Sequence, residues 1–206
     1  MQMSLFSDPA PASQSSVRLP LPDADVQYYP RWLTQAQATA LQHELETTLP
    51  WRQDTVHLFG KTMPIPRLQS WHGDPGCEYG YSGMRLSPSA WTEALTTLRE
   101  RCQRTTGCPF NSVLANWYRD GADSMSLHAD DEPELGPDPV IASVSLGEAR
   151  PFIFKHKHSK ERITQVLEHG SLLVMGHGTQ AHYLHGINKS RKLLSSRINL
   201  TFRYLR

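Results

Sequence analysis

Two segments in the first half of the chain place apolar residues at helical spacing. In the first, leucines recur at four-residue steps, as expected for one face of a helix: Leu41, Leu45 and Leu49. Thr34 and Gln37 form a capping-box pattern ahead of these leucines, and Pro50 follows them. This pattern predicts a helix that begins just after Thr34 and ends before Pro50.

The second helical segment follows a longer irregular stretch. Its apolar stripe consists of Trp91, Leu95, Leu98 and Cys102. Ser87–Pro88 is typical of a cap followed by proline at the first helical position, and Gly107 is typical of a helix end. We expect this helix to span the residues between them. Both stripes are expected to pack against the core and to have no other role.

From residue 111 onward the chain consists of short apolar runs separated by turn residues. The predicted strands span 111–118, 140–146, 151–155, 162–167, 171–176 and 197–205. Residues 51–86, between the two helices, are dense in glycine, proline and aromatic residues, which favours strands and turns. The chain is therefore predicted to be α+β and mainly β, with two helices packed on an antiparallel sandwich or barrel.

The length of 206 residues fits one domain, since domains commonly hold roughly 150 residues. Residues 1–22 are rich in serine, proline, alanine and glutamine, which predicts a flexible N-terminal arm. We therefore expect a single folded domain over 23–206.

Charge and cysteine content narrow the class of protein. The 21 Lys and Arg residues nearly balance the 20 Asp and Glu residues, which excludes a histone-like polycation and confines any nucleic-acid binding to a local patch. No run of roughly 18 apolar residues and no secretion signal is found, so no membrane contact is expected. Three cysteines without C-x-x-C spacing favour a reducing, cytoplasmic setting: Cys77, Cys102 and Cys108.

The last predicted strand carries polar residues along one face. Because alternate residues of a strand point to opposite sides, one face holds Ile198, Leu200, Phe202 and Tyr204, and the other holds Arg197, Asn199, Thr201 and Arg203. The polar row is either the solvent-facing side of an edge strand or an anion pocket, since guanidinium groups bind carboxylates bidentately. Asn116 and Tyr118 share a face of the strand 111–118, which indicates either a polar ligand or contacts to buried backbone.

A histidine and an aspartate two residues apart, His128 and Asp130, are candidate metal ligands. On an extended segment their side chains point the same way. A distant histidine would complete a site of two histidines and one carboxylate, which leaves three coordination positions open on Fe(II). Spacing alone does not choose among the six histidines downstream: His156, His158, His169, His177, His182 and His185.

Together these features resemble the AlkB family of Fe(II)- and 2-oxoglutarate-dependent dioxygenases. The similar segments are LANWYRDGADSMSLHADDEPELGPDPVIASVSLG and HGINKSRKLLSSRINLTFR. A third segment, LFGKTMPIPRLQSWHGDPGCEYGYSGMRLSPSAW, resembles the branch that repairs duplex DNA. The resemblance implies a double-stranded β-helix, a jelly-roll relative, over about 111–206. It also implies a nucleotide-recognition lid over about 51–86.

The resemblance also implies the roles of several residues. The iron ligands would be His128, Asp130 and His185, with His182 as the competitor for the third position. Arg197 would pair with the distal carboxylate of 2-oxoglutarate, helped by Tyr118. The remaining residues of the polar rows would serve the keto-acid end and its surroundings, with Thr201 as a possible shape-filler: Asn116, Asn199, Thr201 and Arg203.

On the substrate side, the resemblance implies that Tyr81 and His128 stack on a flipped base. Glu132 would contact its exocyclic nitrogen, and Asp131 would add negative potential that favours a cationic base. Tyr79 and Ser82 would line the lid, with Arg67 in support. Tyr81 could equally be a core residue, and Glu132 could be an ordinary exposed carboxylate.

Two further features point to DNA. Phe59, at the tip of an expected hairpin with Gly60 in the turn, is either a core residue or a wedge that fills the space left by the extruded base. Basic residues in two loops are candidate phosphate contacts: Lys155, Lys157, Lys160, Lys189, Arg191 and Lys192.

The implied reaction is oxidative demethylation of N-alkylated bases in DNA, such as 1-methyladenine and 3-methylcytosine. It would consume O2 and 2-oxoglutarate and release formaldehyde, succinate and CO2. The alternatives are an RNA or tRNA demethylase with the same chemistry, a catalytically silent jelly-roll binding module, and a small-molecule or protein hydroxylase. We expect a monomer, located at the nucleoid in a bacterium or in the nucleus of a eukaryote.

Overall fold

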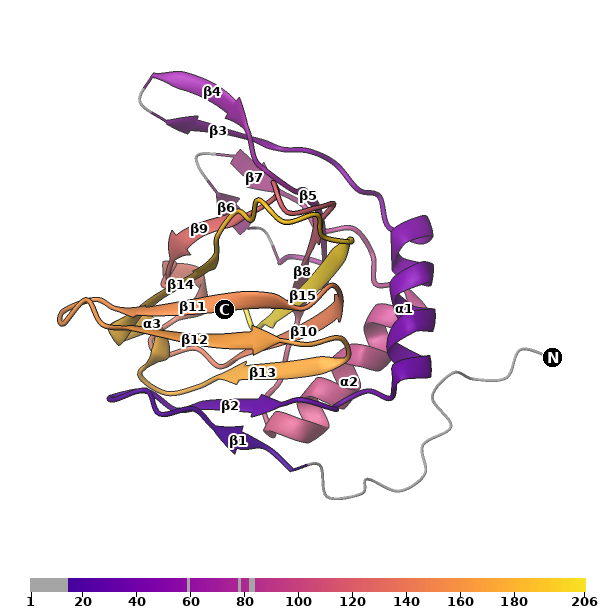
Figure 1. Ribbon diagram of the computed structural model, residues 1–206. Coiled ribbons are helices and arrows are strands. Elements are labelled where there is room, and N and C mark those ends of the chain that lie inside the picture. Colours follow the sequence, from indigo (N-terminus) through magenta and orange to yellow (C-terminus); the bar gives the residue numbers. More distant parts are fainter. Residues whose placement is uncertain (1–14, 59, 78, 82–83) are drawn as a thin grey trace.

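Two antiparallel sheets face each other in the computed structural model, and two helices cover the outer side of the larger sheet (Figure 1). The structure describes residues 15–58, 60–77, 79–81 and 84–206. Within the described chain, no helix combines the length and apolar character needed to cross a membrane. The mainly β architecture is the predicted double-stranded β-helix.

The larger sheet has seven strands in the order β1-β2-β13-β10-β15-β8-β5. In chain order they are β1 (Val17–Arg18), β2 (Val26–Tyr29), β5 (Leu68–Gly73), β8 (Ser112–Tyr118), β10 (Ile141–Gly147), β13 (Ser171–Met175) and β15 (Arg197–Arg203). The strand β15 therefore lies inside the sheet, between β10 and β8, and not at an edge.

The smaller sheet has the order β12-β11-β14-β9. Its strands are β9 (Met125–His128), β11 (Arg150–His156), β12 (Arg162–Leu167) and β14 (Tyr183–Ile187). Apolar side chains from both sheets fill part of the space between them, including Tyr118, Ile141, Phe154 and Leu173. Polar side chains occupy the rest of that space and form the site described below.

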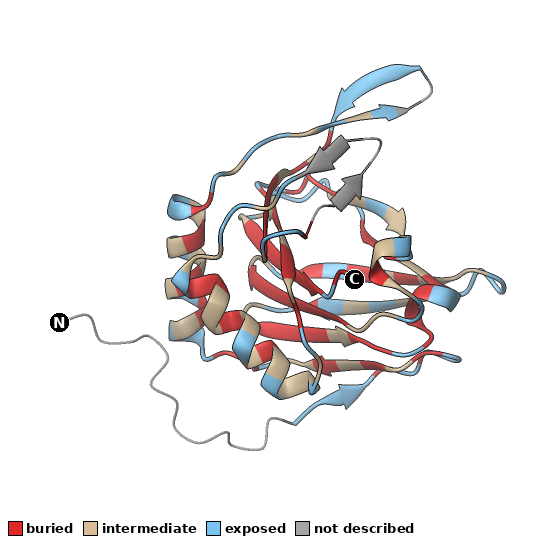
Figure 2. Cartoon of the chain, turned by 180° about the vertical axis from the view of Figure 1, so that it is seen from behind, coloured by how far each residue is buried: buried red, intermediate tan, exposed pale blue. Residues whose placement is uncertain are grey.

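The helix α1 (Gln35–Thr48) begins as the capping box predicts. The Thr34 hydroxyl accepts from the Gln37 backbone N–H, and the Gln37 side chain accepts from the Thr34 N–H. Leu41 and Leu45 are fully buried in a core that α1 and α2 form with the outer face of β10 and β15. Figure 2 shows buried residues concentrated in the sheets and on the helix sides that face them.

The helix α2 (Glu93–Thr106) begins later than Ser87–Pro88, so that part of the prediction was wrong. Thr92 is its N-cap and accepts from the Leu95 N–H, and Gly107 ends it with φ of 70°. The segment ahead of α2 pairs with β5 instead, because the Ser89 N–H donates to the Trp71 carbonyl. This backbone pairing competes with helix formation, which therefore starts at the next side chain that can cap it.

Two short hairpins occupy the region predicted as a lid. They are β3 (Thr55–Leu58) with β4 (Lys61–Pro64), and β6 (Tyr79–Tyr81) with β7 (Met84–Leu86). The β3–β4 hairpin stands out from the rest of the molecule (Figure 1). Leu58 pairs with Lys61, and Gly60 has φ of 74°, as a two-residue hairpin turn requires.

The folded domain starts before residue 23, where the sequence had placed the end of the arm. Leu19 and Leu21 are buried among the apolar residues between the sheets, and β1 pairs with β2. Two leucines gain enough from burial to order a segment whose average composition is polar. Strands β9 and β14 were also missed, because the histidines and glycine in them break the apolar pattern.

Candidate active site

Neighbouring strands of the smaller sheet bring the three predicted metal ligands together. His128 ends β9, and in the ladder it pairs directly with His185 on β14. Asp130 follows β9 by two residues and is 3% exposed. One ligand atom from each of the three residues lies within 4.8 Å of the others, and the Asp130 carboxylate is 3.8 Å from His128 Nε2 and 3.9 Å from His185 Nε2.

The hydrogen bond of His128 orients its ring for metal binding. Its Nδ1 lies 2.9 Å from the Ser126 carbonyl oxygen, which can only accept a hydrogen bond. Nδ1 therefore carries a proton, which leaves Nε2, 3.8 Å from the Asp130 carboxylate, as the ring nitrogen available to a metal. His185 is neutral, because burial, with a smaller effect of His128, lowers its pKa to about 3.

A salt bridge keeps Asp130 ionised. Arg203 on β15 donates from Nη2 to Asp130 Oδ1 at 2.7 Å, and both side chains are buried. Burial alone would raise the pKa of Asp130, but the pKa is held below its ordinary value, with the charge of Arg203 and its hydrogen bond as the leading cause. Two imidazoles and a carboxylate are the donor set that Fe(II) takes in a facial triad.

The polar row of β15 is buried, which decides between the two interpretations of it. The exposed fractions of Arg197, Asn199, Thr201 and Arg203 are 1%, 8%, 7% and 5%. The apolar residues of the opposite face, Ile198, Leu200 and Phe202, pack under the helices. Tyr204 does not belong to that apolar face, because β15 ends at Arg203 and Tyr204 is 46% exposed.

Arg197 is a buried cation without a carboxylate partner among the described residues. Its Nη2 donates to the Ser145 hydroxyl at 2.9 Å, and its guanidinium lies 5.2 Å from the centre of the Tyr118 ring. Nε and Nη1 have no hydrogen-bond partner in the described part of the chain. Burial lowers the pKa of Arg197 to about 10, which leaves the group positively charged at neutral pH.

Asn116 pairs with Asn199 across the β8–β15 ladder, but the two side-chain amides have different hydrogen-bond partners. Asn116 Oδ1 accepts from Arg67 Nε at 2.9 Å. Asn199 Nδ2 donates to the Ser143 hydroxyl and the Val144 carbonyl, and its Oδ1 accepts from Thr201. The polar atoms of Asn199 and Thr201 are thus hydrogen-bonded to other groups of β10 and β15. Their contact with a ligand stays a prediction.

Arg67 is hydrogen-bonded to the larger sheet, and its role in supporting the lid stays a prediction. It is 4% exposed, and besides its contact with Asn116 it donates from Nη1 to the Ser124 carbonyl at 3.4 Å. Glu132 is half-buried just ahead of the 3-10 helix η1 (Pro133–Leu135). Tyr79 and Tyr81 lie in β6, and Phe59 and Ser82 lie outside the described residues.

The candidate phosphate contacts lie in and around two loops. Lys155 lies in β11 and not in a loop as expected, Lys157 and Lys160 lie in the turn after β11, and Lys189, Arg191 and Lys192 are exposed in the loop between β14 and β15. Lys157 is held differently from the others: its Nζ donates to Asp131 Oδ2 at 3.2 Å and to the Gln180 carbonyl at 2.7 Å. The charge of Asp131, expected to favour a cationic base, is thus balanced by Lys157.

Sequence reasoning missed two residues of the site. Gln180, on the short helix α3 (Thr179–His182), is 2% exposed, and its Oε1 accepts from the Asp130 N–H at 2.9 Å and from His185 Nε2 at 3.0 Å. Arg150 is 1% exposed and donates to the carbonyls of Asp120, Asp123 and Asn188. No periodic pattern marks Gln180, whereas an arginine at the start of an apolar strand could have been singled out.

Comparison with known proteins agrees with this geometry. The model of the 2OG-Fe(II) oxygenase superfamily matches residues 25–203. The chain is 42% identical over 179 residues to the human (Homo sapiens) DNA oxidative demethylase ALKBH2, covering 82% of this chain and 69% of that protein. It is 38% identical over 185 residues to the rat (Rattus norvegicus) alpha-ketoglutarate-dependent dioxygenase alkB homolog 3, covering 85% of this chain and 62% of that protein.

Solved structures share the fold. OsALKBH1 superposes with a TM-score of 0.58 at 18% identity, over 86% of this chain and 97% of that chain. An oxidoreductase of the 2OG-Fe(II) oxygenase family from Burkholderia pseudomallei gives a TM-score of 0.58 at 15% identity, over 87% and 84% of the two chains. By its match to the superfamily model and its identity to these relatives, the chain belongs to the 2OG-Fe(II) oxygenase superfamily and, within it, to the AlkB family.

Proposed function

We propose that this protein removes N-methyl groups from alkylated bases in DNA, such as 1-methyladenine and 3-methylcytosine. The observation that carries the proposal is Arg197, a buried cation with no carboxylate partner among the described residues, on the strand that also supplies Arg203 to the metal-ligand Asp130. A buried charge without a counterion is costly. A dicarboxylate co-substrate such as 2-oxoglutarate supplies that counterion.

The residues present fit an Fe(II) ion. His128, Asp130 and His185 would hold it, since each presents a ligand atom. On binding the ion, the neutral His185 ring would carry its proton on Nδ1, and Nε2 would exchange its contact with Gln180 Oε1 for the metal. When iron and 2-oxoglutarate are bound, they supply the activation of O2 that oxidises an N-methyl carbon, with release of succinate, CO2 and formaldehyde.

The protein's own part is to bind and orient. Arg197 would bind one carboxylate of 2-oxoglutarate through its guanidinium, whose Nε and Nη1 have no partner among the described residues, with Tyr118 against the group. Arg203 keeps Asp130 ionised and in place. Gln180 holds the Asp130 backbone by accepting from its N–H. Burial of these groups excludes water, which strengthens each electrostatic contact.

DNA as the substrate is supported by the relatives named as DNA oxidative demethylases and by the two basic loops beside the site. We propose that the hairpins β3–β4 and β6–β7 form the lid over the base, and that Glu132 contacts the base. Exposed cations at Lys189, Arg191 and Lys192 would contact phosphates. A binding module without catalysis would gain nothing from burying the ionised Asp130 beside His128 and His185.

The test is a demethylation assay with Fe(II), 2-oxoglutarate and 1-methyladenine in three oligonucleotides: single-stranded DNA, duplex DNA and RNA. We expect formaldehyde and succinate in equal amounts from DNA, and neither from an Asp130→Ala variant. His43→Ala, at an exposed position on α1, is the matched control and should keep full activity. Turnover of RNA without turnover of either DNA would show that the substrate assignment is wrong.

A further inference from the structure

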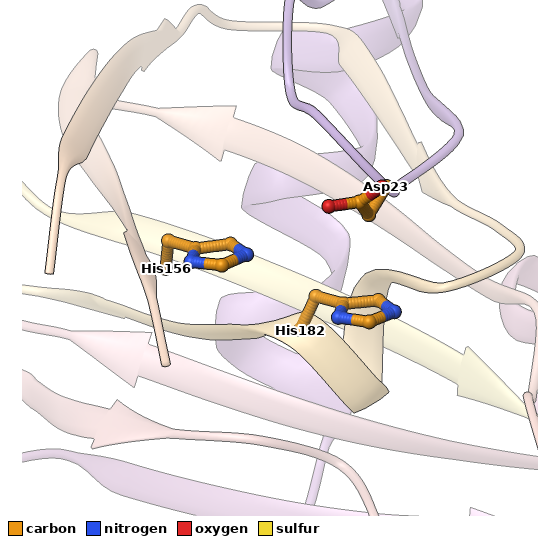
Figure 3. A group of neighbouring side chains, drawn as sticks. All are labelled: Asp23, His156 and His182. Atoms are coloured by element: carbon orange, nitrogen blue, oxygen red, sulfur yellow. The ribbon is translucent and has the colours of Figure 1, made fainter. Parts of the chain in front are cut away.

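A second group of metal-ligating side chains contains none of the three triad residues. It consists of Asp23, in the turn between β1 and β2, His156 at the end of β11, and His182 at the end of α3. Figure 3 shows the two imidazole rings side by side, with the Asp23 carboxylate next to them. One ligand atom from each residue lies within 4.8 Å of the other two.

Backbone pairing fixes the two histidines relative to each other. His156 pairs with Tyr183 in the β11–β14 ladder, and the Lys157 N–H donates to the His182 carbonyl at 2.7 Å. The rings lie within 2° of parallel, with their centres 6.1 Å apart. Both imidazoles are therefore presented from a hydrogen-bonded scaffold and not from a free loop.

The turn that carries Asp23 is fixed to the same scaffold. The Tyr183 hydroxyl donates to the Pro22 carbonyl at 3.0 Å, and the Asp25 N–H donates to the His177 carbonyl at 2.8 Å. Gly178 allows this close approach, because a Cβ at that position would lie 2.0 Å from the Asp23 carbonyl oxygen. The backbone that carries Asp23 is thus held close to α3 by contacts on both sides of it.

A buried ring nitrogen in the group has no partner among the described residues. His156 Nδ1 accepts from the Ser159 N–H at 3.0 Å, so the neutral ring carries its proton on Nε2. Nε2 is buried, and no described residue forms a hydrogen bond with it. Buried polar atoms normally have a partner, and those that do not call for an explanation such as an ion.

We propose that Asp23, His156 and His182 form a second metal site, for a divalent transition-metal ion of the Zn²⁺ class. Two imidazoles and one carboxylate are ligands that Zn²⁺ accepts, with water in the fourth position. The bound ion would clamp the β1–β2 turn to the ends of β11 and α3.

Binding requires two adjustments. Metal bonds of about 2.0 Å place the ligand atoms of a tetrahedral site roughly 3.3 Å apart, so separations of up to 4.8 Å must shorten by up to about 1.5 Å. Asp23 and His182 are exposed and have room to rotate. The ion replaces the proton on His156 Nε2, the ring takes a proton on Nδ1, and the Ser159 N–H, in an exposed turn, is released to water.

The experiment is a titration of the metal-free full-length chain with Co²⁺, followed by visible absorption. We expect two equivalents in the wild type, and one in each of His182→Ala, His156→Asn and the triad variant His128→Ala. His158→Ala, an exposed histidine in the same turn, is the matched control and should keep two equivalents. A single equivalent in the wild type, or two in both His182→Ala and His156→Asn, would overturn the proposal.

Hydrogen exchange at Ser159 gives a second readout that is independent of stoichiometry. In the His128→Ala background, Zn²⁺ should accelerate exchange of the Ser159 amide, because His156 Nδ1 no longer accepts from it. The same addition should leave that amide unchanged when His182→Ala is also present. Unchanged exchange while the ion binds would contradict ligation by His156 Nε2.

Discussion

Arg203 donates a 2.7 Å hydrogen bond to Asp130, which joins the central strand β15 of the larger sheet to the metal-ligand segment after β9. Both side chains are almost completely buried. The pair connects the polar row of β15, which would bind the co-substrate, to Asp130, which would bind the metal. A change in either residue should therefore affect both functions.

Replacing this arginine tests the pair. Arg203→Gln leaves Asp130 buried without its cation, and loss of one partner of a buried ion pair typically lowers the free energy of unfolding by about 3–5 kcal/mol. The measurement is denaturant unfolding at pH 7 and at lower pH. Because the folded-state pKa of Asp130 is depressed, the pair contributes stability above the unfolded pKa, and this is lost as pH falls through the folded pKa.

The wild type should therefore lose more stability than Arg203→Gln between pH 7 and the acid range. Equal pH dependence of the two proteins would show that Asp130 is not held ionised by Arg203.

The triad assignment is tested by single substitutions. His128→Ala, Asp130→Ala and His185→Ala should each abolish turnover while the circular dichroism spectrum is retained, because two ligands hold Fe(II) poorly. His182→Ala is the informative comparison and should keep activity, since His182 lies with Asp23 and His156. An inactive His182→Ala together with an active His185→Ala would reverse the assignment.

Gln180 is predicted to position the metal ligands without touching the metal. Gln180→Met keeps the volume but removes the acceptor for the Asp130 N–H. Loss of such supporting contacts typically weakens metal affinity by about 10–100-fold. Competition with a chelator measures this affinity directly. An unchanged affinity would make Gln180 only a packing residue.

Phe59 is predicted to serve duplex substrates. Extruding a base from a duplex costs a few kcal/mol, and an apolar wedge offsets part of that cost. Phe59→Ala should therefore lower repair of duplex DNA much more than repair of single strands, with no change in melting temperature. Equal losses on both substrates, with a melting temperature lower by several degrees, would place Phe59 in the core.

The sequence predicted those parts of the fold where one physical signal dominates. The capping box at Thr34 fixes the start of α1, and alternation along β15 separates its two faces correctly. Alternation alone did not tell whether the polar face meets solvent or a pocket, because that depends on which strands flank β15. The neighbours β10 and β8 are set by long-range pairing that local pattern does not encode.

In the candidate site too, local pattern predicted some residues and long-range contacts determine the others. His128 and Asp130 lie close together in sequence and were found from their spacing, whereas His185 was identified only through the family resemblance. Gln180 was missed because its role comes from a hydrogen-bond network with Asp130, 50 residues away. The burial of Leu19 and Leu21 was missed because their surroundings come from β2, β13 and the sheet opposite, not from the polar segment around them.

The central claim is that Arg197 binds a carboxylate of 2-oxoglutarate beside the metal. The most direct measurement is a calorimetric titration of 2-oxoglutarate, without O2 and with Mn²⁺ in place of iron, into the wild type, Arg197→Ala and the control Arg31→Ala, at an exposed position. Loss of a buried bidentate partner should cost roughly 3–5 kcal/mol, which is a loss of affinity of a hundredfold or more. We predict that loss in Arg197→Ala alone; equal affinities in all three proteins would contradict the account.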